Sequence, residues 1–245
     1  MSYVWKRLPD RRASGAWQMA ADDWMLSRAE AGECLFRVYE FEAPTVSLGY
    51  FQSWERLKSV PSLARLPWVR RQTGGDLLVH DNEITYAIAA PVEALGVVRD
   101  LPCRVHRAVS EWLKTLGIET QCQPEAGKIS REGAPAGILC FLHPAAGDVL
   151  FQGCKVMGSA QRKRHGAVLQ HGSLLLGTCP AAPWLPGLTN LGATIAGIGA
   201  DGLAQCLEVA LGSKAGLRSW CDEAEIQIRE LATSRYSNSE WNKAR

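Results

Sequence analysis

The sequence predicts an α/β fold (α+β) in which a mixed, largely antiparallel sheet is flanked by helices. Three observations lead to this fold class. Strand-like stretches come in pairs separated by short turns, as in antiparallel hairpins. Stretches with the 3.6-residue period of helices lie between these pairs and after them. The strictly alternating strand–helix–strand pattern of a doubly wound nucleotide fold is absent from the sequence.

The first half of the chain predicts one helix followed by strands. Residues 16–30 place aromatic and small apolar side chains at helical spacing, which indicates an amphipathic helix. CLFRVYEFE at 34–42 alternates as a strand does, and TVSLGYFQ at 45–52 resembles a second strand that Gly49 interrupts. After a proline-bearing connection, LLVHDNEITYAIAAP at 77–91 predicts a hairpin with a polar tip.

The second half repeats this mixture. Residues 101–118 form the clearest helical pattern, with a glycine placed to end it. DVLFQGCKVMGSAQ at 148–161 predicts a hairpin that turns at Gln152-Gly153, and 167–177 predicts a further strand. The segment from about 199 to 245 has helical patterns. Because neither a repeat nor a low-complexity linker divides the chain, we expect a single domain over 1–245.

Composition narrows the class of protein. The 27 basic and 25 acidic residues give a net charge of +2, so we expect neither nucleic acid nor a membrane as partner. The one basic run, at 162–165, is a solvated loop or a docking site for an acidic partner. With neither a signal-peptide core nor an apolar stretch of about 20 residues, we expect a soluble, cytoplasmic protein. Most of its eight scattered cysteines should be buried and reduced, without disulfides or bound metal.

The stretch Arg70-Arg71-Gln72-Thr73-Gly74-Gly75 is the first candidate site. Two glycines let the backbone approach a ligand, and adjacent arginines donate hydrogen bonds that suit a carboxylate or phosphate. The alternative is a hairpin turn with exposed arginines. The stretch matches neither the Walker pattern nor the dinucleotide-binding glycine pattern, so it does not by itself indicate a nucleotide.

Cys140 and Lys155, fifteen residues apart, form the second candidate. Lys155 lies between Gly153 and Gly158 on a strand-like segment, where a surface lysine would need no glycines. An ammonium beside a thiol favours the thiolate, which attacks carbonyl groups. The alternative is an inert, buried cysteine.

These residues resemble a known family. Between about 15 and 178, several motifs in order resemble the catalytic domain of lipoate–protein ligase A and biotin/lipoyl ligases, and most closely its cysteine-dependent octanoyltransferase branch. The resemblance implies a biotin/lipoate ligase-like fold, catalytic roles for Cys140 and Lys155, and a substrate-binding role for a further set: Arg70, Arg71, Thr73, Gly74, Gly75, His80, Gly158, Ser159 and His171. Within the matching motifs, Glu83, Tyr86 and the glutamine-histidine-glycine-serine segment at 170–173 also agree with the family.

Three positions depart from the family pattern. Asp76 replaces a third glycine, and Cys154 stands where the family usually has an arginine. The acidic residue that often follows the cysteine is not obvious in FLHPAAG at 141–147. The loss of the third glycine and the short C-terminal part favour acyl transfer over ATP-dependent ligation.

The resemblance implies an octanoyltransferase that works without a cofactor. Cys140 would take octanoyl from acyl carrier protein and pass it to a lysine of a lipoyl-domain protein, of the glycine cleavage H protein or 2-oxoacid dehydrogenase E2 type. Leu77, Val79 and Ile138 are candidates to line an acyl tunnel. Three alternatives stay open: an ATP- and magnesium-dependent lipoate–protein ligase, an amidotransferase that moves lipoyl or octanoyl between lipoyl proteins, and a domain that binds an acylated protein without turnover.

Overall fold

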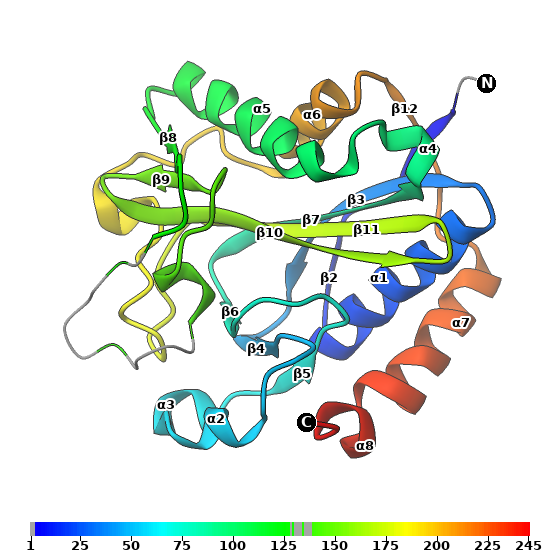
Figure 1. The fold of residues 1–245 in the computed structure, drawn as a ribbon, viewed down its shortest axis with the longest axis horizontal. Coiled ribbons are helices and arrows are strands. Elements are labelled where there is room, and N and C mark those ends of the chain that lie inside the picture. Colours follow the sequence, from blue (N-terminus) through cyan, green and yellow to red (C-terminus); the bar gives the residue numbers. More distant parts are fainter. Residues whose placement is uncertain (1–2, 128, 130–133, 135–138) are drawn as a thin grey trace.

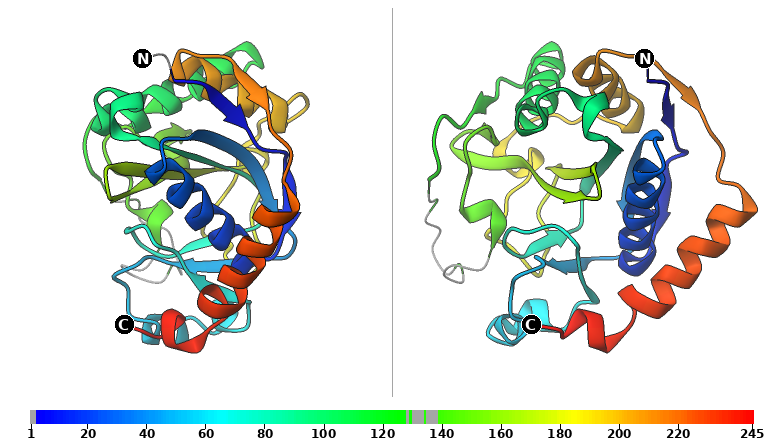
Figure 2. Two further views of the ribbon diagram at one scale, coloured as in Figure 1. Left: turned by 90° about the vertical axis from the view of Figure 1, so that its right-hand side faces the viewer. Right: turned by 45° about the vertical axis from the view of Figure 1, so that its right-hand side comes forward.

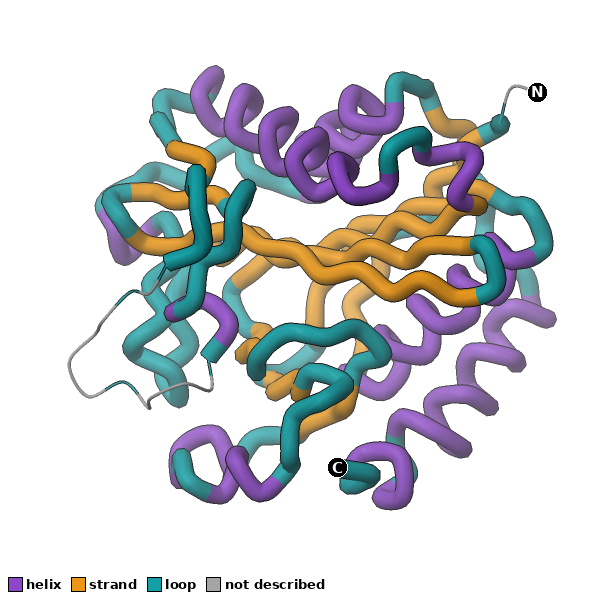
Figure 3. The backbone as a smooth tube through the Cα atoms, viewed as in Figure 1, coloured by secondary structure: helices purple, strands orange, loops and turns teal. Residues whose placement is uncertain are grey.

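A computed structural model describes residues 3–127, 129, 134 and 139–245, and its centre is a long, curved sheet (Figures 1 and 3). Nine strands of the described chain belong to this sheet. Their order across it is β12 (Ala215–Leu217), β1 (Trp5–Arg7), β3 (Cys34–Phe41), β7 (Glu83–Pro91), β11 (Ala167–Leu175), β10 (Cys154–Arg164), β9 (Val149–Phe151) and β8 (Gln121–Cys122), with β2 (Arg11–Ala13) beside β3.

The sheet is antiparallel through its middle and parallel at one end. From β3 to β8 every neighbouring pair is antiparallel, whereas β12, β1 and β3 run parallel and β2 is parallel to β3. The predicted hairpin at 148–161 is confirmed. Its turn residues Gln152 and Gly153 have φ of 48° and 74°, values that suit a tight hairpin turn.

Helices cover both faces of the sheet (Figure 1). On one face, α5 (Leu101–Thr115) and α6 (Ala200–Leu211) bury a core with alternate residues of β3 and β7, such as Phe36 and Ile88. On the other face, α1 (Gly15–Glu30) packs on the residues in between, such as Leu35 and Ala89. Strand alternation therefore supplies two separate cores. The short helix α4 (Val92–Leu95) and the 3₁₀ turn η1 (Val98–Asp100) connect β7 to α5.

The helix α1 is confirmed, with Ser14 accepting a hydrogen bond from the Trp17 N–H at its start. The prediction that it is amphipathic is wrong, because its polar side is buried as well. The helix α7 (Asp222–Leu231) and the π turn η4 (Ala232–Tyr236) lie along that side (Figure 2, right). Asp23 is buried there and accepts hydrogen bonds from Arg235 and Tyr236, whereas Asp22 is buried against the sheet. The short helix α8 (Ser239–Asn242) follows.

A second, smaller sheet lies below the first in Figure 1. It contains β5 (Trp68–Arg70), β4 (Thr45–Leu48) and β6 (Leu78–His80), with β4 parallel to β5 and antiparallel to β6. Within the proline-bearing connection the chain forms the short helices α2 (Glu55–Lys58) and α3 (Pro61–Ala64). The 3₁₀ turns η2 (Cys140–Leu142) and η3 (Thr189–Leu191) complete the elements.

The predicted hairpin at 77–91 is wrong. Its two strands form, but β6 pairs with β4 in the small sheet and β7 pairs with β3 and β11 in the large one. The polar tip at His80-Asp81-Asn82 is therefore a crossover between sheets, with Asn82 at a φ of 47°. Local pattern predicts strands and turns, whereas partners depend on the rest of the chain.

No helix within the described part of the chain is long and apolar enough to cross a membrane.

Candidate active site

The structure brings Cys140 and Lys155 together. Cys140 opens the 3₁₀ turn η2, and its N–H donates to the Leu77 carbonyl at 2.9 Å, which ties this turn to the segment before β6. Lys155 is the second residue of β10, directly after the hairpin turn. Its Nζ lies 3.8 Å from the Cys140 Sγ and 3.5 Å from the Cys140 carbonyl oxygen. The cation is thus close enough to stabilise a thiolate, or an oxyanion formed beside it.

Asp148 holds Lys155 in this position and was missed in the sequence. Its Oδ2 lies 2.6 Å from the Lys155 Nζ, and the two side chains are only 6% and 3% exposed. The Ala145 N–H also donates to this oxygen, at 2.6 Å. FLHPAAG itself contains no acidic residue, and Asp148 comes directly after it. The sequence could have indicated this pair, because Asp148 begins the predicted hairpin and Lys155 lies on its opposite strand.

The glycine at 158 leaves room for the lysine. A Cβ at this position would lie 2.5 Å from the Lys155 Cε and 2.7 Å from its Nζ. Any larger residue would therefore displace the lysine or the strand.

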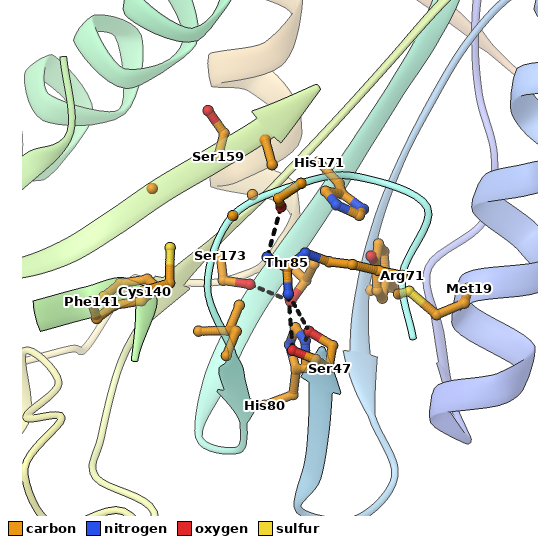
Figure 4. Close-up of a pocket in the computed structure, with 17 residues that line it drawn as sticks. Met19, Ser47, Arg71, His80, Thr85, Cys140, Phe141, Ser159, His171 and Ser173 are labelled. Atoms are coloured by element: carbon orange, nitrogen blue, oxygen red, sulfur yellow. Dashed lines mark hydrogen bonds between the residues drawn. The ribbon is translucent and has the colours of Figure 1, made fainter. Parts of the chain in front are cut away.

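A mostly apolar cavity of about 530 Å³, including its open mouth, lies between the two sheets next to Cys140. Figure 4 shows Cys140 and Phe141 at one end and Met19, from α1, at the other. Besides Cys140, seven of the nine residues expected to bind substrate line it: Arg71, Gly74, Gly75, His80, Gly158, Ser159 and His171.

The glycine pair forms a loop that Arg71 holds from the inside. Gly75 has a φ of +90°, and a Cβ on Gly49 would be only 1.8 Å from the Gly75 carbonyl oxygen, so two glycines pack backbone to backbone. Arg71 donates to the carbonyl oxygens of Ser47, Gly74 and Asp76 at 2.7–2.9 Å. Burial lowers the pKa of Arg71, and the nearby Cys140 and Asp76 partly oppose that effect.

Arg70 takes a different place from the one expected. It is fully buried away from the cavity and donates to carbonyl oxygens of Gly49, Gln52 and Asn242 at 2.6–3.0 Å. These bonds join the loop after β4 to the C-terminal helix α8. Arg71 therefore organises the cavity wall, whereas Arg70 joins the loop after β4 to α8.

Two histidines on the cavity wall have both ring nitrogens engaged. His171 donates from Nδ1 to Asp22 at 2.8 Å and shares a 2.7 Å hydrogen bond between Nε2 and the Thr73 hydroxyl. Thr73 itself is fully buried behind the loop and does not line the cavity. Asp22 also pairs with Arg37. Burial alone would raise the pKa of Asp22, but Arg37 and His171 together hold it below its usual value.

His80 lies in the second network. Its Nδ1 donates to Glu83 at 2.5 Å and its Nε2 bonds the Ser47 hydroxyl at 2.8 Å, while Phe41 stacks on the ring. Thr85, on β7, donates to the same Glu83 carboxylate. His80 and His171 thus both have fixed ring orientations. Their hydrogen-bond partners could not be read from the sequence.

The expected tunnel residues need a correction. Leu78 lines the cavity, whereas Leu77 and Val79 point the other way into the apolar cluster behind the small sheet. Alternation along β6 sends neighbouring side chains to opposite faces, so the expectation was wrong by one position. Ile138 lies outside the described residues.

Asp76, which replaces a third glycine, lies beside this site. It accepts a hydrogen bond from the Gln52 side-chain amide at 3.2 Å and another from His143 Nδ1 at 3.2 Å. Cys154 is buried at the start of β10, away from the cavity, with its Sγ 3.5 Å from the Gln152 carbonyl oxygen.

Comparison with known proteins gives consistent matches. The family model described as Lipoyl protein ligase A/B catalytic domain matches residues 14–182. The chain is 33% identical to Octanoyltransferase LipM of Kyrpidia tusciae over 73% of its own length and 68% of that protein, and 31% identical to LipM of Bacillus cereus over 70% and 65%. It thus spans about two thirds of the length of these relatives.

Solved structures agree in fold. A lipoate-protein ligase A bound with ATP superposes with a TM-score of 0.70 at 20% identity, over 99% of both chains. A bi-partite lipoate protein ligase from Thermoplasma acidophilum, reported with its E2 lipoyl domain, has a TM-score of 0.71 at 18% identity, over 98% of this chain and 96% of that one. The expected fold class, a mixed and largely antiparallel sheet flanked by helices, is confirmed.

Proposed function

Because the chain belongs to the lipoyl protein ligase A/B catalytic domain family, we propose that it is an octanoyltransferase of protein lipoylation that carries the acyl group on Cys140. One observation carries this proposal: the Cys140 Sγ lies 3.8 Å from the Lys155 Nζ, next to an apolar cavity. The relatives that share most of this chain are octanoyltransferases, which supports the same activity.

In the first step the Cys140 thiolate attacks the thioester carbon of the donor, which we propose is octanoyl–acyl carrier protein. The new carbon–sulfur bond forms as the donor thiolate leaves, so one thioester replaces another. The Lys155 ammonium, held by Asp148, stabilises both the attacking thiolate and the oxyanion that develops on the thioester oxygen. Interactions of this kind contribute about 10²–10³-fold in rate.

In the second step a lysine amine of the acceptor attacks the octanoyl–Cys140 thioester. An amide replaces a thioester, which is downhill, so we propose that neither ATP nor another cofactor takes part. The acceptor we propose is a lipoyl domain of the glycine cleavage H protein or 2-oxoacid dehydrogenase E2 type, in the cytoplasm.

The cavity suits the acyl chain. Its lining is mainly apolar, and Met19 and Tyr39 lie among the residues that border it. Burial of about seven methylene-sized groups at about 0.8 kcal/mol each contributes roughly 5–6 kcal/mol before entropic costs. That is enough to favour a medium-length chain over an acetyl group.

Mass spectrometry of the protein after incubation with octanoyl–acyl carrier protein tests the proposal. We expect an octanoyl adduct on Cys140 that disappears when a lipoyl domain is added. Cys140→Ala should abolish both adduct and transfer, whereas Cys122→Ala, which changes an exposed cysteine on β8, should leave both intact. Normal transfer by Cys140→Ala would rule out the covalent route.

The same assay separates the other candidate activities. Modification of the domain only with lipoate, ATP and magnesium would identify a ligase. Modification only from an octanoylated or lipoylated protein would identify an amidotransferase.

A further inference from the structure

One departure from the family pattern lies beside the nucleophile, together with a histidine. Asp76 is the residue in place of a third glycine, and His143 comes three residues after Cys140. Their side chains are joined by a 3.2 Å contact between the His143 Nδ1 and the Asp76 Oδ2, and are 30% and 34% exposed. An imidazole paired through one nitrogen to a carboxylate is the usual arrangement of a base, because the carboxylate fixes the ring and stabilises its charged form.

Backbone geometry places this pair next to Cys140 from both sides. In a 3₁₀ turn, residues three apart lie on the same side, and the His143 N–H closes the turn by donating to the Cys140 carbonyl at 3.1 Å. On the other side, Asp76 precedes Leu77, whose carbonyl accepts the Cys140 N–H. The electrostatic influence of both Asp76 and Cys140 on Arg71 agrees with this closeness.

The second step of the proposed reaction needs such a group. An acceptor lysine arrives as an ammonium, which has no lone pair to attack a thioester. Lys155 is in a 2.6 Å ion pair with Asp148, and an ammonium in that pair cannot accept a second proton.

The other histidines do not fit this task. His80 and His171 use both ring nitrogens and are almost fully buried. His106 is a buried residue of α5, and His165 lies on the distant turn between β10 and β11. His143 is half-exposed, and its Nε2 makes no hydrogen bond to any residue that the structure describes.

We infer that Asp76 and His143 form the site that receives the acceptor's lysine ammonium, with His143 as the base that removes its proton. The inference rests on the proposed function, since it concerns the second half of that reaction. The ammonium gives one proton to the His143 Nε2, and the neutral amine then attacks the thioester carbon. The carbon–sulfur bond breaks, the second proton of the amine goes to the Cys140 sulfur, and His143 releases its proton to water. Asp76 is a positioning residue, which orients the ring and attracts the cation.

The charged groups around this site agree with a cationic substrate. The Asp76 carboxylate faces His143 and solvent, while the Arg71 guanidinium is turned inward toward carbonyl oxygens. Lys155 lies behind Cys140, neutralised by Asp148. Asp76 is thus a partly exposed anion that directly precedes Leu77, the residue whose carbonyl oxygen accepts the Cys140 N–H.

The test measures the two half-reactions separately. Enzyme is first loaded with octanoyl–acyl carrier protein, and Cys140 acylation is followed by mass spectrometry. Loaded enzyme is then mixed with a lipoyl domain, and single-turnover transfer is measured between pH 6 and 10. We expect His143→Gln to acylate within about twofold of wild type but to transfer about 10²-fold more slowly at pH 7. Its deficit should shrink toward pH 10, where the acceptor lysine, whose ordinary pKa is about 10.4, is increasingly neutral.

Rescue by added imidazole distinguishes a base from a residue that only supports the fold, because imidazole can replace a missing base but cannot repair a structural defect. It should restore transfer by His143→Ala but not by Asp76→Asn, where the ring is present without its orienting carboxylate. His165→Gln, a change of an 81% exposed histidine, is the matched control and should transfer normally.

Normal transfer by His143→Gln, or an equal loss in both half-reactions, would overturn the inference. So would the absence of rescue by imidazole. If wild-type enzyme forms no adduct on Cys140, the proposed function fails and this inference fails with it; a wild-type adduct with unimpaired transfer by His143→Gln refutes this inference alone.

Discussion

A single methyl group at position 158 should separate Lys155 from Cys140. In Gly158→Ala the new Cβ would lie 2.5 Å from the Lys155 Cε, whereas ordinary contact begins near 3.4 Å, so the lysine must move by about 0.9 Å. Misplacement of a catalytic group by about 1 Å typically costs about 10²-fold in rate. That factor corresponds to about 2.7 kcal/mol of activation free energy. Folding should survive, because alanine in a strand is not less favourable than glycine and Gly158 has no positive φ.

The assay is the rate of Cys140 modification by two reagents. Octanoyl–acyl carrier protein tests the full reaction, and iodoacetamide tests thiolate reactivity without using the acyl cavity, which Gly158 also lines. We expect both rates to fall, the first by about 10²-fold. Gly216→Ala on β12 is the matched control, because a Cβ there meets nothing within 4 Å.

Two results would refute the reasoning. If both rates stay within about threefold of wild type, the position of Lys155 does not control Cys140. If only acylation falls while iodoacetamide reacts normally, the methyl group acts by narrowing the cavity.

Three further predictions concern other parts of the molecule. Arg70→Met should lower the free energy of unfolding in urea by at least about 3 kcal/mol, since it removes several buried hydrogen bonds from a charged donor to carbonyl oxygens, while acylation per folded molecule stays normal; the reverse pattern would place Arg70 in the chemistry. Burial lowers the pKa of His106, so below the ordinary histidine pKa of about 6.5 the unfolded chain binds one more proton and stability falls as pH falls. Urea titrations of wild type should therefore show a loss of up to about 1.4 kcal/mol per pH unit between about pH 6.5 and 5, which His106→Gln removes; an equal slope in both proteins would contradict this. Met19→Trp fills the end of the cavity opposite Cys140, so competition between acyl thioesters should shift from octanoyl to shorter chains; unchanged selectivity would exclude that end as the limit on chain length.

Local features of the sequence were sufficient for most elements. The helix at 101–118, the hairpin with Gln152-Gly153 at its turn and the strand that ends before Gly49 all follow from period and turn chemistry. The 77–91 stretch shows the limit, because its two strands belong to different sheets. Periodicity depends on a few neighbouring residues, whereas pairing depends on strands that are distant in the sequence.

The same division applies to the site. Residue type and motif order singled out Cys140, Lys155 and the glycine pair. The different places of Arg70 and Arg71 could not be predicted, because neighbours in an extended chain point to opposite sides and only packing decides which side is the cavity.

By itself, the sequence determined the fold class, the family and the two residues proposed to carry the chemistry, because these depend on local pattern and on the reactivity of single side chains. Only the tertiary structure decided which side chains of the site are paired: Asp148 with Lys155, Asp22 with His171, and Asp76 with His143. Ion pairs and hydrogen bonds act over about 3 Å. Residues up to 149 positions apart can meet at such a distance only when the sheets bring them together.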